Sequence, residues 1–284
     1  MQLLSIIHDI REDHPTMGLR DMYYKIQPRC MGRDKFEAFC KDEKLGSKRQ
    51  KNYFRTTDSS GVQRFTNYIK DIKPEHIDQI WQSDITYYNV NGRFHYLSFI
   101  LDAYSRRIIG FSVSKGLSTN QTTLPALKMA IKTRGKIIQK GLIFHSDGGG
   151  QYYAKDFLKL THDYKIINSM CEYAWENGKA ERINGVIKNN YLKHRGIKNF
   201  TELCKEVDRA VSLYNNEKPH IELKRKSPIA FEAEVVSLTK QTKLKMKESL
   251  DAKGSILGAS SPLKSKQTKH RNQDVLSARI KEMS

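Results

Sequence analysis

The chain has 284 residues, a formal net charge of +19 and a 38% share of hydrophobic residues. Its longest apolar stretch, near residues 97–101, is too short to cross a bilayer, and no signal-peptide pattern opens the sequence. These features exclude a membrane protein and lead us to expect a cytoplasmic one. The four cysteines form no CxxC pair, which argues against a zinc site and favours reduced, buried thiols.

The basic excess favours an anionic polymer as partner, because neutralised phosphates release counterions. Residues 1–47 are predicted to be helical, with Phe36, Phe39 and Cys40 at helical spacing after a turn-like HPTMG. Two helices joined by a turn in a basic context indicate a helix-turn-helix-like DNA-binding region. The alternative is a helical hairpin that packs on the next domain. Residues 48–76 are basic and turn-rich, and predict a linker that lies along phosphates or is a solvated connector.

From Trp81 onward the pattern becomes strand-like. WQSDITYY alternates between two faces, and NVNGR has the chemistry of a hairpin turn. FHYLSFILDAY is nearly continuously apolar, as a central buried strand would be, and RRIIGFSV predicts a third strand.

The next segments alternate between helix and strand. LSTNQTTLPALKMAIKT predicts a helix with Pro125 in its first turn, GLIFHSD a strand, AKDFLKLTHDY a helix and KIINSM a strand; two more helices follow in residues 180–216. This is the ribonuclease-H-like order, an α/β fold with a mixed five-stranded sheet flanked by helices. We expect this core to occupy residues 77–235. Residues 236–284 lose apolar periodicity and predict a basic, disordered tail.

Three acidic residues stand in contexts that together indicate a metal site. Asp84 lies within a strand, Asp147 ends a strand just before three glycines, and Glu181 lies on a helix. Each has an ordinary explanation when it is taken alone: a strand-edge residue, an Asp-Gly turn and a solvated helix face. At 100° per residue, Glu181 shares its helix face with Asn184 and Lys188.

The buried stripe of the same helix is predicted to comprise Ala180, Ile183, Ile187 and Tyr191. Carboxylates brought together by the fold would repel one another and hold their protons tightly. A pair of Mg²⁺ ions relieves this repulsion, because hard cations take oxygen ligands. Two such ions can activate an attacking oxygen and stabilise a leaving one in phosphodiester chemistry.

The combined motifs resemble a known family. WQSDITYY, LDAYSRRIIGF, IFHSDGGGQYY, INSM and AERINGVIKNNYL, in this order, are similar to the catalytic core of bacterial insertion-sequence transposases of the IS-three group, which is itself similar to retroviral integrase. HPTMGLRDMYYKI and KSPIAFEA also match the second-reading-frame product of that group. The resemblance covers about residues 1–235.

The resemblance implies roles for individual residues. Asp84, Asp147 and Glu181 would form the catalytic, metal-binding triad, whereas Asp102 would be structural. The residues implied in DNA binding or in flanking the site are Lys188, Arg182, Asn184, Gln151, Tyr152, His145 and Asn177, although His145 and Tyr152 also fit packed core positions. Between Asp147 and Glu181 lie 33 residues, two fewer than the family usually has, and Glu172 and Glu176 are nearby substitutes without the matching helix.

The sequence therefore predicts a DDE-type transposase that uses Mg²⁺, with Mn²⁺ as a substitute, to cleave at element ends and transfer a 3′-hydroxyl strand. The resemblance implies double-stranded DNA as substrate, an upstream-reading-frame partner protein or fusion, and a homo-oligomer on DNA. One alternative is a catalytically degenerate relic that only binds DNA. Another is a ribonuclease-H-like nuclease without strand transfer.

Overall fold

The fold is described from a computed structural model, which covers residues 2–47, 65–70, 72–135, 141–239 and 241–242. The chain divides into two compact units, Met1–Val235 and Val236–Ser284. Most of the predicted linker, residues 48–64 and 71, and nearly all of the predicted tail lie outside the described residues. Among the described residues, none of the helices combines the length and the apolar character that crossing a bilayer requires.

A five-stranded sheet forms the centre of the first unit, with the strand order β3-β2-β1-β4-β5. The strands β1, β2 and β3 are antiparallel neighbours, whereas β4 and β5 run parallel to β1. Their bounds are Ile80–Val90, Arg93–Asp102, Ile108–Ser114, Ile143–Ser146 and Ile167–Met170. This mixed sheet confirms the predicted ribonuclease-H-like fold class.

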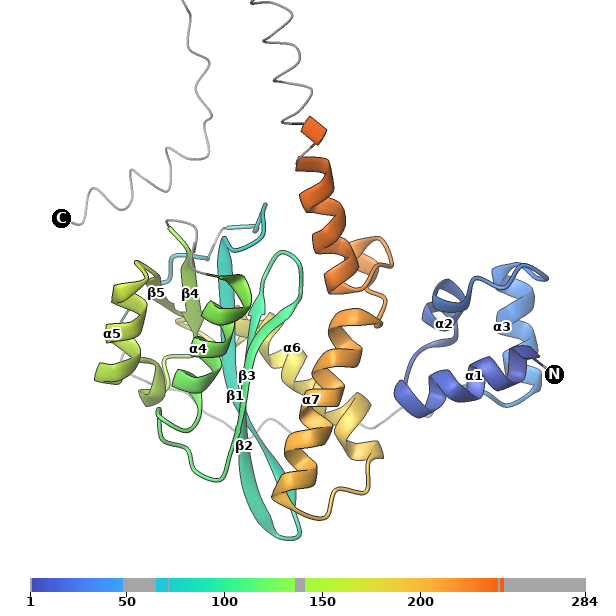
Figure 1. Ribbon diagram of the computed structural model, residues 1–284, viewed down its shortest axis with the longest axis horizontal. Coiled ribbons are helices and arrows are strands. Elements are labelled where there is room, and N and C mark those ends of the chain that lie inside the picture. Colours follow the sequence, from blue (N-terminus) through green and yellow to red (C-terminus); the bar gives the residue numbers. More distant parts are fainter. Residues whose placement is uncertain (1, 48–64, 71, 136–140, 240, 243–284) are drawn as a thin grey trace, which may run out of the picture. The chain divides into compact units, whose positions relative to one another are not determined.

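Helices cover both faces of the sheet, as the sequence predicts (Figure 1). On one face, α4 (Thr123–Arg134) and α5 (Lys155–Asp163) pack on Trp81, Ile100 and Phe144. On the other, α6 (Gly178–Val186) and α7 (Phe200–Asn216) pack on Leu97, Phe99 and Leu101. The alternation of Phe99 and Ile100 between the two clusters follows the period of two in a strand.

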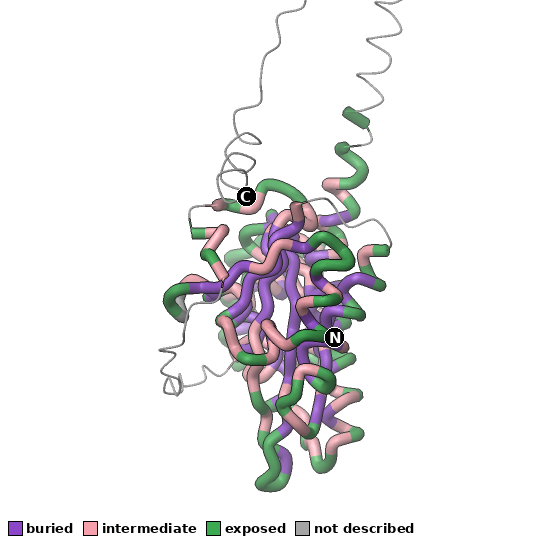
Figure 2. Tube along the Cα trace, turned by 90° about the vertical axis from the view of Figure 1, so that its left-hand side faces the viewer, coloured by how far each residue is buried: buried purple, intermediate pink, exposed green. Residues whose placement is uncertain are grey.

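The close packing of α4 explains a glycine on β3. A Cβ atom at Gly110 would stand 2.2 Å from the carbonyl oxygen of Ala126 and 2.9 Å from the Cβ of Ala130. Position 110 therefore accepts only a residue without a side chain. Figure 2 shows buried residues gathered on the inside of the molecule, with exposed residues on the surrounding helices and loops.

The N-terminal region forms α1 (Gln2–Asp13), α2 (Leu19–Ile26) and α3 (Arg33–Asp42), which confirms its predicted helical character. Its own hydrophobic cluster includes Ile7, Met22, Phe36 and Cys40, all fully buried. All four cysteines are free, but Cys30 is exposed, so the expectation of buried thiols is wrong for that residue.

Candidate active site

The three predicted carboxylates come from three different elements of the core. Asp84 lies within β1, Asp147 directly follows β4, and Glu181 lies in the first turn of α6. The parallel pairing of β1 with β4 joins Gln82 to His145. Continuing that register by two residues brings Asp84 level with Asp147, so the sheet itself brings these two side chains together.

The pKa of Asp84 is shifted by burial and by its two acidic neighbours. Burial, followed by the charges of Asp147 and Glu181, raises the pKa of Asp84 from 3.8 to about 7. Burial also raises the pKa of Asp147, although the N–H of Gly149 donates to its Oδ1 at 3.1 Å and opposes that rise. Among the described residues, no lysine or arginine forms a salt bridge with any of the three carboxylates.

This donor set has the chemistry that a hard divalent cation requires, because it offers carboxylate oxygens that repel one another and that form no salt bridge among the described residues. Within the described part of the chain, however, no three His, Cys, Asp or Glu side chains are grouped closely enough to hold a metal ion as they stand. The carboxylates therefore interact through space without forming a closed cage. Glu181 is exposed at the surface of α6, so its side chain is free to turn toward Asp84.

Asn184 orients Asp84. Its Nδ2 donates to Oδ2 of Asp84 at 2.8 Å, and the asparagine is 5% exposed. The sequence placed Asn184 on the same helix face as Glu181 and implied a DNA contact. The structure instead gives it a buried contact with the carboxylate of the neighbouring strand.

The turn after Asp147 is shaped by Gly148. This residue has φ +75°, and a Cβ atom there would stand 2.3 Å from the side chain of Met170. Gln151, two residues after Gly149, donates from Nε2 to the carbonyl of Leu117 at 3.1 Å. Its side chain therefore holds the segment before α4, and no described contact tests the predicted role in DNA binding.

Tyr152 lies in the core, the packed position that the sequence also allowed, and no described contact tests its predicted place among the DNA-binding residues. It is 2% exposed, and its hydroxyl lies 3.0 Å from Oγ of Ser83. The ring packs against Phe144 and Phe157.

Lys188 contacts β1 beside the acidic residues. Its Nζ donates to Oγ1 of Thr86 at 2.6 Å and lies 5.4 Å from the centroid of the Tyr87 ring. The regular helix predicted through this region is interrupted, because a π-helical turn begins at Ile187 directly after α6. Such turns are rare and occur frequently at functional sites. The predicted buried stripe of Ala180, Ile183, Ile187 and Tyr191 is nevertheless confirmed.

Two flanking residues are buried supports. His145 lies with Nδ1 3.0 Å from Oγ of Ser169, and burial lowers its pKa to about 4, so it is neutral. Asn177 donates from Nδ2 to the carbonyl of Ser83 at 2.8 Å. Ser83 thus contacts Asn177 and Tyr152 just behind Asp84, a role that sequence reasoning missed. The only sign of this role in the sequence is that Ser83 is a small polar residue in the alternating segment WQSDITYY.

The nearby glutamates are already engaged elsewhere. Glu176 accepts from the backbone N–H groups of Glu172 and Tyr173 and from the side-chain amide of Asn67. Glu172 lies 3.5 Å from Nζ of Lys70. Neither has the position of Glu181 on the helix that faces Asp84, which favours Glu181 as the third acidic residue.

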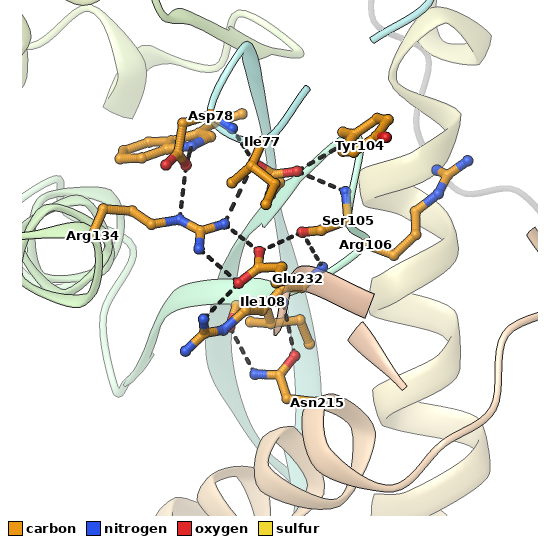
Figure 3. A network of polar contacts seen from close by, with 12 residues as sticks. Ile77, Asp78, Tyr104, Ser105, Arg106, Ile108, Arg134, Asn215 and Glu232 are labelled. Atoms are coloured by element: carbon orange, nitrogen blue, oxygen red, sulfur yellow. Dashed lines mark hydrogen bonds and ion pairs between the residues drawn. The ribbon is translucent and has the colours of Figure 1, made fainter. Parts of the chain in front are cut away.

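Asp102 belongs to a separate polar network at the end of β2. It is fully buried and accepts N–H groups from Asp78 at 2.6 Å and Ser105 at 2.7 Å. Arg134 lies between Asp78 and Glu232, with N–O distances of 2.7 Å and 2.6 Å (Figure 3). These contacts tie β2 and α4 to the segment that carries Glu232.

Comparisons with known proteins find an integrase core in this chain. Two family models, both described as integrase core domain, match residues 74–174 and 162–228 and together span more than half of the chain. An uncharacterised 31 kDa protein of insertion element IS600 from Shigella sonnei is 28% identical over 71% of this chain and 75% of its own length. Transposase InsF for insertion sequence IS3A from Escherichia coli is 34% identical over 33% of this chain and 31% of its own length.

Among solved structures, the HTLV-2 integrase catalytic core in complex with magnesium is 23% identical, with a TM-score of 0.45, and the match covers 55% of this chain and 96% of that one. The fold class rests on the sheet order and helix placement described above rather than on this likeness. The family and the fold support a function in DNA transposition. With integrase-core models matching residues 74–228, the chain belongs to the integrase-core family, and insertion-sequence transposases, among them that of IS3A, are the relatives that it is similar to.

Proposed function

We propose that this protein is a DDE-type transposase in which Asp84, Asp147 and Glu181 hold Mg²⁺, or Mn²⁺ in its place. The observation that carries the proposal is the convergence of these acidic residues from β1, the end of β4 and α6, with Asn184 hydrogen-bonded to Asp84 and no salt bridge to any of them within the described part of the chain. When bound, the metal ions supply Lewis-acid stabilisation to the oxygens of a reacting phosphodiester.

The reaction has two steps of the same kind. In the first, water adds to a phosphodiester at the element end, one P–O bond breaks, and a 3′-hydroxyl is freed. In the second, that hydroxyl attacks another phosphodiester, so one P–O bond forms as another breaks. Each step breaks one P–O bond and forms another, so no energy cofactor is needed.

The residues around the acidic triad position the DNA and the carboxylates. Asn184 fixes the rotamer of Asp84, and Gly148 lets the backbone turn sharply beside Asp147. Lys188, in the π-helical turn after α6, contacts Thr86 of β1 two residues from Asp84 and offers a charge for a phosphate oxygen. The N-terminal helices would add contacts to double-stranded DNA, and two element ends imply an oligomer together with an upstream-frame partner protein or fusion.

A degenerate relic that only binds DNA is the second candidate. The arrangement of the carboxylates favours it to this extent: no three metal-binding side chains form a closed set among the described residues. The same assay separates the two functions, because a relic binds element ends and neither cuts nor joins them. A nuclease without strand transfer would cut the ends and leave no joined molecules.

The test is Mg²⁺-dependent cleavage and joining of labelled element-end DNA, with the upstream partner added in a parallel reaction. Glu181→Gln should abolish both products. Glu172→Gln is the matched control, since this glutamate precedes the helix and contacts Lys70 instead. Activity retained in Glu181→Gln, or lost in Glu172→Gln, would remove Glu181 from the triad.

A further inference from the structure

A cleft of about 810 Å³ lies against the side of α6 that points away from Glu181. The helix contributes Lys179, Arg182 and Val186 to its wall, and the segment 218–222 after α7 closes another side. At 100° per residue, these three positions project about 100–160° away from Glu181 around the helix axis. The cleft is therefore distinct from the carboxylate site, although one helix supplies both.

Two of the three acidic residues that line this cleft form ion pairs with arginines. Glu222 forms an ion pair with Arg106, and Asp21 forms one with Arg225. Oε2 of Glu176 accepts from two backbone N–H groups and a side-chain amide, which carry no charge. Among the described residues, the lining therefore sets three cations without an ion pair against the single carboxylate of Glu176.

Lys179, Arg182 and Lys218 are those cations. None of the three has a side-chain ion pair or hydrogen bond among the residues that the structure describes. Burial, followed by the charge of Arg106, lowers the pKa of Lys179 to about 8. Burial also lowers the pKa of Lys218, where the attraction of Asp21 is opposed by the charge of Arg182. An anion in the cleft would relieve both the desolvation and the repulsion.

Two further polar atoms in the wall have no protein partner in the described part of the chain. They are Oε1 of Gln82, a residue 3% exposed, and Nε2 of His220. Burial lowers the pKa of His220 to about 3, so the ring is neutral and Nε2 can donate in one tautomer. Oε1 of Gln82 is an acceptor, so a water or a hydroxyl group, and not a phosphate oxygen, would satisfy it. Unpaired buried groups of this kind are costly, and a bound ligand or water would satisfy them.

We propose that this basic cleft, lined by Lys179, Arg182, Lys218, Gln82 and His220, binds the sugar-phosphate backbone of DNA outside the catalytic face. The aromatic residue in the wall, Tyr214, is 1% exposed and offers no ring face for a base, which favours backbone over nucleoside recognition. The proposal rests on DNA being the substrate. It adds a second contact line on the side of α6 that points away from Glu181.

The test compares two double variants of the full chain by fluorescence anisotropy of a labelled element-end duplex over a series of salt concentrations. Lys179→Gln/Arg182→Gln removes two cations of the cleft. Lys128→Gln/Lys132→Gln removes two exposed lysines of α4, on the other face of the sheet. Each lost phosphate contact should reduce the slope of log affinity against log salt by about 0.9, so the cleft variant should lose about 1.8 and the control little.

Lys218→Gln tests the cleft from a second element and should reduce the slope by about 0.9. Equal slopes for the wild type and both cleft variants, with DNA still bound, would overturn the cleft and leave the proposed function standing. No DNA binding by the wild type would overturn both. A cleft that binds inorganic phosphate, with DNA slopes unchanged on mutation, would show a site for small anions only and also overturn the proposal.

Discussion

Two groups of acidic residues lie near the strand pair β1 and β2, one around Asp84 and one around Asp102, and their charges are balanced differently. Asp102 pairs across the sheet with Trp81, three residues from Asp84, which corresponds to about 10 Å along the strand. Around Asp102, the buried acidic residues are matched by arginines (Figure 3). Around Asp84, the neighbouring carboxylates of Asp147 and Glu181 repel it, and none of the three has a salt bridge among the described residues. The comparison shows which acidic residues the fold needs and which it leaves open for a ligand.

One acidic residue from each group shows the contrast in pKa, Glu232 shifted down and Asp84 shifted up, although burial also raises the pKa of Asp102. Although burial acts against it, the hydrogen bonds and charge of Arg134, with help from Ser105 and Arg107, hold the pKa of Glu232 below its usual value. The pKa of Asp84 is instead raised by burial and by neighbouring carboxylates. Glu232 therefore stabilises the fold as an anion, whereas ionised Asp84 opposes folding until a cation is bound.

The largest effect is expected from removing an acidic residue of the unmatched group. Asp147→Asn should lower cleavage and joining by more than about 100-fold, since even partners behind a metal ligand contribute about 10–100-fold. Its thermal midpoint should not fall, because a repelling charge is lost. The control is Asp156→Asn on the exposed side of α5. An active Asp147→Asn protein would contradict the division between the two groups.

Breaking the matched group should instead cost stability. Arg134→Met would leave buried Asp102 without its cation and Glu232 with Arg107 alone, and losing one partner of such a network costs about 3–5 kcal/mol. Urea denaturation gives the free energy of unfolding directly. Lys132→Met, an exposed change on the same helix, should have little effect. Equal midpoints for the two variants would mean that the network contributes nothing measurable.

A smaller effect on catalysis is expected at Asn184. Asn184→Leu removes the hydrogen bond to Asp84 and should lower strand transfer by about 10–100-fold, as other partners of metal ligands do. The same replacement at Asn216, exposed at the end of α7, should leave the rate unchanged. Product yields in single-turnover reactions measure both. Equal rates for the two variants would show that Asp84 needs no orientation by Asn184.

The smallest effect is a difference in pH dependence. The folded-state pKa of Asp84 lies above its ordinary value of 3.8, so stability present at low pH is lost as the pH rises toward about 7. With chelator present, the stability advantage of Asp84→Asn over the wild type should grow between pH 4 and 7 and then level off. For Glu232, whose pKa is lowered, the contribution is lost as the pH falls. Parallel profiles for Asp84→Asn and Glu232→Gln would contradict the comparison.

Much of the core was predictable because it depends on local periodicity. The alternation of WQSDITYY and the apolar run of FHYLSFILDAY correspond to β1 and β2, and the stripe from Ala180 to Tyr191 is buried as predicted. The three acidic residues were identified from their contexts, and the register of β1 with β4 explains why two of them meet.

Other features depend on contacts between distant segments, which no periodicity encodes. Tyr152 lies next to a glycine-rich turn, yet its hydroxyl reaches Ser83, 69 residues away. Asn184 was placed on the correct helix face, but its bond to Asp84 follows from how α6 packs on β1. The π-helical turn at Ile187 has no signal in the sequence. Lys179 and Lys218 are 39 residues apart, so only the fold brings them to one cleft.

The most direct test of the central claim is a calorimetric titration of the full chain with Mn²⁺ in the presence of element-end DNA. The account predicts saturable binding by the wild type, little binding by Asp84→Asn, and unchanged binding by Asp156→Asn. Metal binding of equal strength in the wild type and Asp84→Asn would contradict it, because the unmatched carboxylates would then not be the ligands.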